Sequence, residues 1–421
     1  MGRFYRFREG KKRHQIVQYN VAQSDSFASH WSLDPGVAYL NHGAFGACPK
    51  PVLAYQSELR AWMEFNPMQF LVRECHLLID KSRQQLASLV GTDAANLVFS
   101  QNISASVSAV LRSVLLRSGD EILVTDHGYS SCTAAAKLVA GRVGASVTTA
   151  QILVPVESED QVVDAILDAV TERTRLALID HIPSSTAVVF PVRRIINLLK
   201  ERGIRVLVDG AHAPGVLPLQ LDQIDADWYV GHCHKWLCAP KGASFLYASP
   251  AEQQTLDPLI ISHGLHSTRK GRSRFHDVFD WAGTFDPTAW CSVGKAIDFL
   301  EGLLPGGLPA LQQRNHNLVV QARRHLLSEL PAQPTCPESM LGSMASLMLP
   351  EDPMPEPRYA EVHSTTPVQA HQMALAERDI ELPWMYFPSF PKRMIRISAH
   401  AYNNLCDFDV ADSIRELLES E

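Results

Sequence analysis

Short apolar runs alternate along the chain with longer stretches in which apolar residues recur at helical spacing. The short runs predict strands at Asn96–Ser100, Glu121–Thr125, Arg175–Ile179, Arg205–Val208 and Trp228–Val230. The longer stretches predict helices at Leu53–Phe65, His76–Val90, Val107–Leu116, Val162–Val170, Val192–Arg202 and Trp290–Leu303. Runs that are apolar throughout are typical of strands buried on both faces. The alternation therefore predicts an α/β fold whose central sheet is mostly parallel.

Polar side chains follow each predicted strand. Asn102, His127, His181, Asp209 and His234 come after the five strands in turn. The carboxyl ends of parallel strands meet at one edge of a sheet, and ligands bind there. We therefore expect these five side chains to gather around one ligand site.

Breaker residues divide the chain. The cluster Pro305-Gly306-Gly307 predicts a boundary between a large domain, residues 31–304, and a smaller α/β domain, residues 305–421. Within the large domain, residues 31–60 are expected to contribute to the entrance of the site. Residues 1–30 are predicted to form a basic N-terminal arm.

One charged run interrupts the pattern. Ser262–Asp277 contains Arg269, Lys270, Arg272 and Arg274, which predicts a mobile, solvated loop near the mouth of the site.

Composition narrows the classes of function. The chain has 421 residues, 46% hydrophobic and 20% charged, as in soluble globular proteins, and its net charge of -7 argues against a nucleic-acid partner. No apolar run approaches the roughly 20 residues that span a bilayer, so no membrane partner is expected. The eight cysteines are scattered, which favours reduced thiols and a cytoplasmic protein. An organellar presequence in the basic first twenty residues is disfavoured by Glu9 and the shortage of serine.

Lys235 is the strongest candidate for covalent chemistry. It lies in a loop with His232, His234 and Trp236. A lysine among apolar and aromatic groups loses part of its preference for the ammonium form and becomes an amine nucleophile, which can hold an aldehyde cofactor. A cofactor with a pyridine ring also needs a carboxylate at its ring nitrogen, and Asp209 is the candidate. A zinc site at His232-Cys233-His234 is disfavoured, because consecutive residues do not give the separations of a tetrahedral site.

Four motifs together resemble the class V aminotransferases, a family of fold-type I enzymes that use pyridoxal 5′-phosphate (PLP). They are Tyr39–Gly46 (YLNHGAFG), Asp209–Gly215 (DGAHAPG), His234–Gly242 (HKWLCAPKG) and Met394–Asn403 (MIRISAHAYN). Within the family, the first and third motifs look most like the isopenicillin N epimerase-like branch. The resemblance runs from about residue 30 to about residue 415.

The resemblance implies a PLP site with assigned roles. Lys235 would hold the cofactor and act as the catalytic base, and Asp209 would bind the ring nitrogen. His127 is favoured for stacking on the ring, with Tyr129 as second candidate. Other implied contacts are Ser104, Ala105 and His234 at the phosphate, Ser184 or Ser185 and His212 at the ring hydroxyl, and Thr284 reaching the cofactor phosphate of the partner in a homodimer with shared sites.

The resemblance also implies an amino-acid substrate. Asn41, His42 and Gly43 would hold it from the early loop, and Tyr129 would lie near it. Arg396 lies in an apolar strand, where an unpaired guanidinium is costly, and a substrate carboxylate is the partner expected there. A structural salt bridge of Arg396 is the alternative.

Epimerisation at the α-carbon is the function that the branch favours. The second acid that it requires is not identified by the sequence, and His127, Tyr129 and His42 are candidates. A carbon–sulfur lyase acting on cysteine or its conjugates and an aminotransferase are the rivals. A cysteine desulfurase is disfavoured, because Asp379–Met394 contains no cysteine. A PLP-binding protein without turnover is the non-enzymatic alternative.

Overall fold

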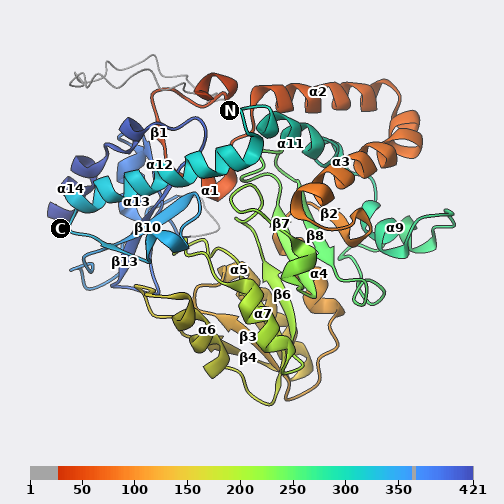
Figure 1. Cartoon of the computed structure of the whole chain (residues 1–421), viewed down its shortest axis with the longest axis horizontal. Coiled ribbons are helices and arrows are strands. Elements are labelled where there is room, and N and C mark those ends of the chain that lie inside the picture. Colours follow the sequence, from red (N-terminus) through yellow and green to blue (C-terminus); the bar gives the residue numbers. More distant parts are fainter. Residues whose placement is uncertain (1–26, 363–366, 421) are drawn as a thin grey trace.

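A seven-stranded sheet forms the centre of the computed structural model, which describes residues 27–362 and 367–420 (Figure 1). The strand order is β2-β8-β7-β6-β5-β3-β4, and β8 alone in this sheet runs antiparallel to its neighbours. The prediction of a mostly parallel sheet is confirmed. The strands are β2 (Leu97–Ser100), β3 (Glu121–Thr125), β4 (Ser146–Ala150), β5 (Thr174–Asp180), β6 (Arg205–Asp209), β7 (Trp228–His232) and β8 (Ser244–Ala248).

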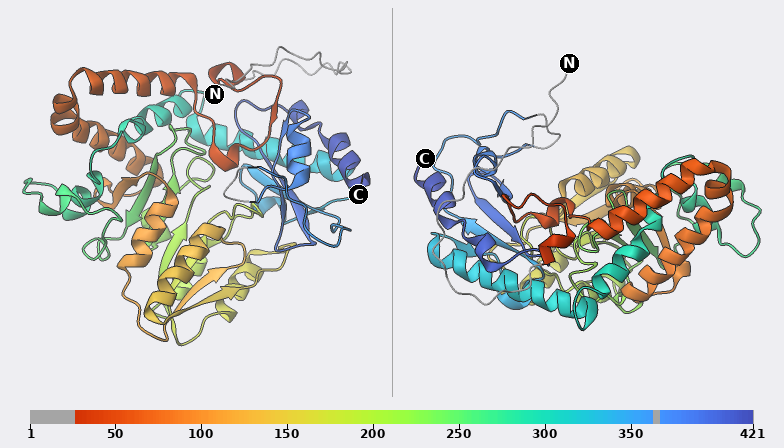
Figure 2. Two further views of the ribbon diagram at one scale, coloured as in Figure 1. Left: turned by 180° about the vertical axis from the view of Figure 1, so that it is seen from behind. Right: turned by 90° about the horizontal axis from the view of Figure 1, so that it is seen from above.

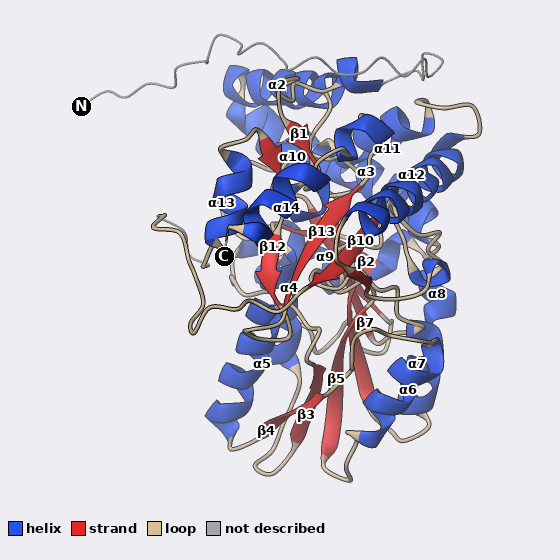
Figure 3. Cartoon of the chain, turned by 90° about the vertical axis from the view of Figure 1, so that its left-hand side faces the viewer, coloured by secondary structure: helices blue, strands red, loops and turns tan. Residues whose placement is uncertain are grey.

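Helices cover both faces of this sheet (Figure 3). One face carries α4 (Ile103–Ser113) and α5 (Ser130–Val143), and the other carries α6 (Glu159–Asp168), α7 (Val192–Lys200) and α8 (Leu221–Ile224). Alternate residues of β6 explain why both faces need cover. Val206 and Val208 belong to one hydrophobic core and Leu207 to the other, and all three are fully buried.

The N-terminal helices pack beside the sheet with two later helices (Figure 2). The group comprises α2 (Lys50–Phe65), a π-helical turn (Gln69–Glu74), α3 (Cys75–Val90), α10 (Thr288–Cys291) and α11 (Val293–Glu301), with a 3-10 turn at Ala94–Asn96 before β2. Helix α3 ends at Gly91, which adopts the left-handed conformation that closes a helix. The predicted helix Trp290–Leu303 is interrupted at Ser292, so it is two helices.

A second, four-stranded sheet of order β12-β13-β10-β9 forms from the C-terminal part of the chain. Its strands are β9 (Gln333–Pro334), β10 (Met344–Leu349), β12 (Trp384–Tyr386) and β13 (Arg393–Ser398). The helices of this part are α12 (Gly307–Glu329), α13 (Ala370–Ala376) and α14 (Ala411–Glu419), with 3-10 turns at Glu338–Met340 and Leu405–Phe408. The domain boundary at residue 304 stays a prediction.

The early loop joins this C-terminal part. Strand β1 (Ala38–Tyr39) pairs in parallel with β11 (Ile380–Glu381), and α1 (His42–Phe45) follows it. The predicted basic arm lies outside the described residues as far as residue 26, and Phe27–His30 form a 3-10 turn. No helix in the described ranges has the length and apolar character needed to cross a membrane.

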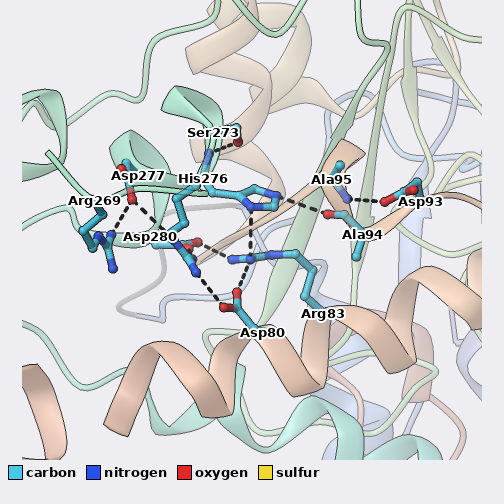
Figure 4. A network of polar contacts seen from close by, with 11 residues as sticks. Asp80, Arg83, Asp93, Ala94, Ala95, Arg269, Ser273, His276, Asp277 and Asp280 are labelled. Atoms are coloured by element: carbon cyan, nitrogen blue, oxygen red, sulfur yellow. Dashed lines mark hydrogen bonds and ion pairs between the residues drawn. The ribbon is translucent and has the colours of Figure 1, made fainter. Parts of the chain in front are cut away.

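The charged run differs from its prediction (Figure 4). A 3-10 turn at His263–His266 and helix α9 (Arg274–Asp280) occupy much of it, so a loop throughout Ser262–Asp277 is wrong. Its arginines form ion pairs. Two of them, Arg269 and Arg272, join Asp80 and Arg83 of α3 and Asp277 and Asp280 of α9 in a set of ion pairs that we call the arginine–aspartate network.

Candidate active site

A cavity of about 320 Å³ opens at the carboxyl ends of β5, β6 and β7. Parallel strands bring their final residues to one edge, as the alternating pattern predicted. Eight predicted site residues line the cavity: Ser104, Tyr129, Ser184, Asp209, His212, His234, Lys235 and Arg396. Asn102, one of the five strand-end side chains expected at the site, lines it too. Six further lining residues were not among those predicted: Ala44, Phe45, Ile103, Asp180, Ala211 and His232.

Lys235 presents its amine to this cavity. Its Nζ lies 3.1 Å from Nε2 of His212, whose Nδ1 accepts a hydrogen bond from the indole N–H of Trp236 at 3.3 Å. Removal from bulk water, and then the positive charge of Arg396, lower the pKa of Lys235 to about 7. The amine is therefore available as a nucleophile or a base near neutral pH, as predicted from the aromatic loop.

Two buried carboxyl groups lie at adjacent strand ends. Asp180 of β5 is opposite Asp209 of β6 in the sheet register, and both line the cavity. Asp209 accepts hydrogen bonds from the Ala211 amide at 3.0 Å and from the Cys132 thiol at 3.4 Å. Burial raises the pKa of Asp209, and burial together with the charge of Asp209 raises the pKa of Asp180 well above its usual value. The pair therefore favours a cationic or proton-bearing ligand group.

Arg396 of β13 brings a guanidinium to the same cavity. Its Nη1 donates to the carbonyl and hydroxyl oxygens of Ser184 at 2.6 and 2.8 Å, and its Nη2 donates to Asn41 Oδ1 at 2.9 Å. Burial lowers the pKa of Arg396 to about 10. The salt bridge considered as an alternative is not found, because Arg396 pairs with no carboxylate among the described residues. The guanidinium can therefore accept a carboxylate from a ligand.

The opposite wall favours an anion. Asn102 caps α4, its Oδ1 accepting from the Ala105 amide at 2.9 Å, and the free N–H groups and dipole of a helix start attract negative charge. His234 donates Nδ1–H to the Ala243 carbonyl at 2.8 Å, and the His232 ring lies 4.2 Å from it. Burial lowers the pKa of His234 to about 4, and burial and the Lys235 charge lower the pKa of His232. An anion beside these rings would favour their charged, donating forms.

His127 does not reach the cavity. Its ring is buried, with Nδ1 2.9 Å from Thr186 Oγ1 and Nε2 2.9 Å from the Ile152 carbonyl. Tyr129, two residues later, lines the cavity and keeps 48% of its surface exposed. Of the two candidates for the stacking ring, only Tyr129 lines this cavity, and the choice between them stays a prediction.

Three predicted residues of the early loop, Asn41, His42 and Gly43, contact residues at or next to the cavity without lining it themselves. Asn41 binds Arg396, the Gly43 amide donates to Ser398 Oγ at 3.2 Å, and His42 lies 3.1 Å from the Lys235 carbonyl through Nε2. None of the three lines the cavity, whereas Ala44 and Phe45 of the same loop do. Thr284 is exposed and does not line the cavity of its own chain. Its predicted role toward a partner's cofactor stays a prediction.

A histidine–cysteine cluster lies under the lysine loop. His42, Cys238 and His400 bring one nitrogen or sulfur atom each within 4.8 Å of one another. Both ring nitrogens of His42 are already engaged, by Tyr402 Oη at 2.8 Å and the Lys235 carbonyl, and its ring stacks on His400 at 4.1 Å. These contacts support a packing role for the cluster beneath Lys235.

Comparison with known sequences agrees with the motifs. The family model described as Aminotransferase class-V matches residues 39–341. The chain is 33% identical over 344 residues to isopenicillin N epimerase of Streptomyces clavuligerus, covering 78% of this chain and 85% of the relative. It is 29% identical to a protein of Arabidopsis thaliana named probable chloroplastic L-cysteine desulfhydrase, covering 80% of this chain and 74% of the relative.

Solved structures share the architecture. A cysteine desulfurase of Escherichia coli matches with a TM-score of 0.74 at 20% identity, covering 94% of this chain and 98% of that one. A cystine C–S lyase matches with a TM-score of 0.72 at 20% identity, covering 91% and 97%. At this identity the likeness shows the fold alone, and it confirms the predicted fold type I.

Proposed function

The chain belongs to the class-V aminotransferase family of PLP-dependent enzymes, and we propose that it acts at the α-carbon of an amino-acid substrate as an epimerase. The observation that carries this proposal is the Arg396 guanidinium, which has no carboxylate partner among the described residues and faces the same cavity as the Lys235 amine. The epimerase preference is supported by isopenicillin N epimerases at 33% and 32% identity.

The side chains of the cavity fit PLP. An amine of lowered pKa suits the aldehyde, a buried carboxyl suits the ring nitrogen, and a helix start beside two imidazoles suits the phosphate. We assign Lys235 to the aldehyde and Asp209 to the ring nitrogen. The other assignments are Tyr129 at the ring face, His212 and Ser184 at the ring hydroxyl, Ser104, Ala105 and His234 at the phosphate, and the exposed Thr284 at the phosphate of a partner subunit.

Each residue then has a defined task. PLP supplies, when bound, a sink for the electron pair left at the α-carbon. Arg396 binds the substrate carboxylate, while Asn41 and Ser184 hold the guanidinium in place. Lys235 Nζ removes the α-proton as general base, because a pKa lowered to about 7 leaves a substantial share of its amine uncharged near neutral pH. Asp209 keeps a proton at the ring nitrogen.

Epimerisation also needs an acid on the second face of the α-carbon. Of the three candidates, Tyr129 lines the cavity, whereas His127 and His42 use both ring nitrogens in contacts elsewhere. We therefore propose Tyr129 for this role. Tyr129→Phe should reduce racemisation far more than it reduces exchange of the α-proton on the Lys235 face.

A carbon–sulfur lyase is the second candidate, favoured by the desulfhydrase relatives at 29% identity. The same α-carbanion can expel a β-substituent, so product analysis separates the two. An epimerase exchanges the α-proton with solvent deuterium and loses stereochemistry, a lyase releases pyruvate and sulfide from cysteine, and an aminotransferase gives a keto acid. A holoenzyme whose absorbance responds to no amino acid would refute all three in favour of a PLP-binding protein.

We also propose a homodimer. Phe65, Met68, Val72 and Leu77 are 88%, 64%, 57% and 56% exposed along consecutive turns of α2, the π-helical turn and α3. Such a run of apolar side chains is typical of an interface. Light scattering should give twice the chain mass, and the double substitution Phe65→Glu with Met68→Glu should give monomers. Leu115→Glu, at a residue 90% exposed elsewhere, is the matched control.

We propose a cytoplasmic location as well. Seven cysteines, all except Cys406, are buried thiols, which suits a reducing compartment. A fluorescent fusion of the full chain would test this, and import into an organelle would contradict it.

A further inference from the structure

A chain of two hydrogen bonds links a buried indole to the lysine. The Trp236 N–H lies 3.3 Å from His212 Nδ1, and His212 Nε2 lies 3.1 Å from Lys235 Nζ. Trp236 and His212 are each 1% exposed, so water does not replace either contact.

The direction of the first bond determines the second. An indole N–H can only donate, so Nδ1 of His212 must accept. A neutral imidazole has one accepting nitrogen, and Nε2 therefore carries the proton. An ammonium group can only donate, and it would meet an N–H at Nε2. Both hydrogen bonds can form together only when Lys235 is an uncharged amine that accepts a hydrogen bond from Nε2–H of His212.

We propose that Trp236 is a positioning residue that fixes the tautomer of His212 and thereby keeps Lys235 uncharged and nucleophilic before the cofactor binds. This inference rests on the proposed attachment of PLP at Lys235. No group of the cofactor is needed for it, because all three side chains belong to this chain.

Other charged or titratable groups near these three side chains affect the protonation of Lys235 in opposite directions. Arg396 faces Lys235 and favours the uncharged amine, whereas Asp209 and Cys132 oppose it. The raised pKa of the Cys132 thiol keeps that group neutral near pH 7, so the Asp209 carboxyl is the main group that favours the ammonium form of Lys235.

The groups that act most strongly on His212 disfavour its protonation. They are Lys235, Arg396, His232 and His42, which add to burial in lowering its pKa well below the usual value. A protonated His212, donating from both nitrogens, is thereby excluded at neutral pH.

Packing fixes the indole. The Trp236 ring lies 4.8 Å from the His42 ring, and a Cβ on Gly43 would come within 3.5 Å of Trp236 Cζ2 and 2.5 Å of Met344 Sδ. The short contact with Met344 means that Gly43 lets α1 approach β10 closely, and a Cβ there would only touch the indole. The indole is 1% exposed and is also packed against the His400 ring at 6.1 Å, which holds its N–H toward His212.

The decisive comparison is Trp236→Phe against Trp290→Phe. Trp290 is also buried, and its indole donates to the Gly242 carbonyl at 2.9 Å, away from the cavity. The measurement is the pH dependence of the rate at which cofactor-free, full-length protein captures PLP, followed by stopped-flow absorbance. In wild type the rate should rise with pH to a plateau with a midpoint near 7.

In Trp236→Phe, His212 is free to carry its proton on Nδ1 and to accept from a Lys235 ammonium. The midpoint should therefore rise by about one pH unit, which is about tenfold slower capture at pH 6. Trp290→Phe should keep the wild-type midpoint. Equal midpoints in wild type and Trp236→Phe would overturn the inference.

Two further measurements keep the tests separate. If Lys235→Ala captures PLP as wild type does, the proposed function fails at its attachment site. If that capture is lost while Trp236→Phe keeps the wild-type midpoint, only the present inference fails. Should Trp236→Phe not fold, the ¹⁵N spectrum of histidine-labelled wild type, with His212→Gln for assignment, reads the tautomer directly. Protonated Nε2 supports the inference, and protonated Nδ1 refutes it.

Discussion

Two regions of the molecule bury arginines, but the arginine is paired with carboxylates in one region and with neutral oxygens in the other. In the arginine–aspartate network, Arg83 is 2% exposed and binds Asp80 and Asp280, each at 2.5 Å (Figure 4). In the cavity, Arg396 is 3% exposed and binds the neutral oxygens of Ser184 and Asn41. The Nε atom of each arginine has no hydrogen-bond partner, so the two arginines differ in whether their other nitrogens bind carboxylates.

The difference indicates which buried charges serve folding and which serve binding. A buried charge is tolerable when paired and costly when alone. The network supplies its own counterions and holds α9 against α3. In the cavity, no described carboxylate forms an ion pair with Arg396 and no described lysine or arginine forms one with Asp209. An amino acid and a pyridine ring nitrogen would supply these two partners.

The largest expected effect is that of Lys235→Ala on activity. The variant should lose covalent capture of PLP, and kcat/KM should fall by about 10⁴-fold or more, because the proposed mechanism gives this one side chain both the attachment and the base. Its resistance to urea should not fall, since the amine takes part in no ion pair. Capture assays with Lys270→Ala, at an exposed lysine, provide the control. Unchanged capture by Lys235→Ala would contradict the assignment of the cavity to binding.

Arg83→Met should have the next largest effect, on stability. It removes the two charge-assisted hydrogen bonds that Arg83 donates to Asp80 and Asp280, each contributing about 1.5–3 kcal/mol, while Arg272 still pairs with both acids. The free energy of unfolding should therefore fall by about 3–5 kcal/mol. The KM for substrate should stay the same. Arg60→Met is the control, because the Arg60–Asp286 pair is exposed and should contribute at most about 1 kcal/mol. Urea denaturation measures all three proteins, and a loss no larger than that of Arg60→Met would contradict a structural role for the network.

Arg396→Met makes the same substitution in the cavity, with the opposite expectation. The substrate KM should rise about 100-fold, which corresponds to about 2.7 kcal/mol, because the carboxylate loses its charged partner. The free energy of unfolding of the cofactor-free protein should not fall, since no buried carboxylate is left unpaired. Steady-state kinetics and urea denaturation test the two parts. A loss of stability like that of Arg83→Met would show that Arg396 serves folding.

The sequence predicted five of the seven strands of the central sheet, and missed β4 and β8, because strand prediction rests on local pattern and parallel-sheet topology. Asp209 was found as a polar residue at a strand end. Lys235 was found from its aromatic loop, and Arg396 from its apolar surroundings and the motif around it. His127 and Tyr129 lie in one short turn, and its backbone path decides which ring faces the cavity. Asp180 was missed because its importance comes from Asp209 on the neighbouring strand. The ion pairs of the charged run were missed for the same reason, since their partner Asp80 lies about 190 residues earlier.

The smallest expected effect is on the pH dependence of stability. It compares Asp80 of the arginine–aspartate network with Asp180 of the cavity. Burial alone would raise the pKa of Asp80, but the hydrogen bond from Arg272 and the charge of Arg83 outweigh burial and lower it. Burial and Asp209 raise the pKa of Asp180. A lowered pKa contributes stability that is lost as the pH falls through the folded-state value. A raised pKa contributes stability that is lost as the pH rises through its folded-state value.

Asp180→Asn and Asp80→Asn should therefore respond to pH in opposite ways. Asparagine mimics the protonated acid, so Asp180→Asn should match wild type near pH 4 and become the more stable protein by about 1 kcal/mol or more at pH 8. Asp80→Asn should be less stable than wild type at pH 8, and this deficit should shrink below pH 4. Urea midpoints of the cofactor-free proteins between pH 3 and 8 measure both. If the urea midpoint of Asp180→Asn stayed parallel to that of wild type across this range, the pKa of Asp180 would not be raised. The contrast between the acids of the cavity and those of the network would then rest on Asp209 alone.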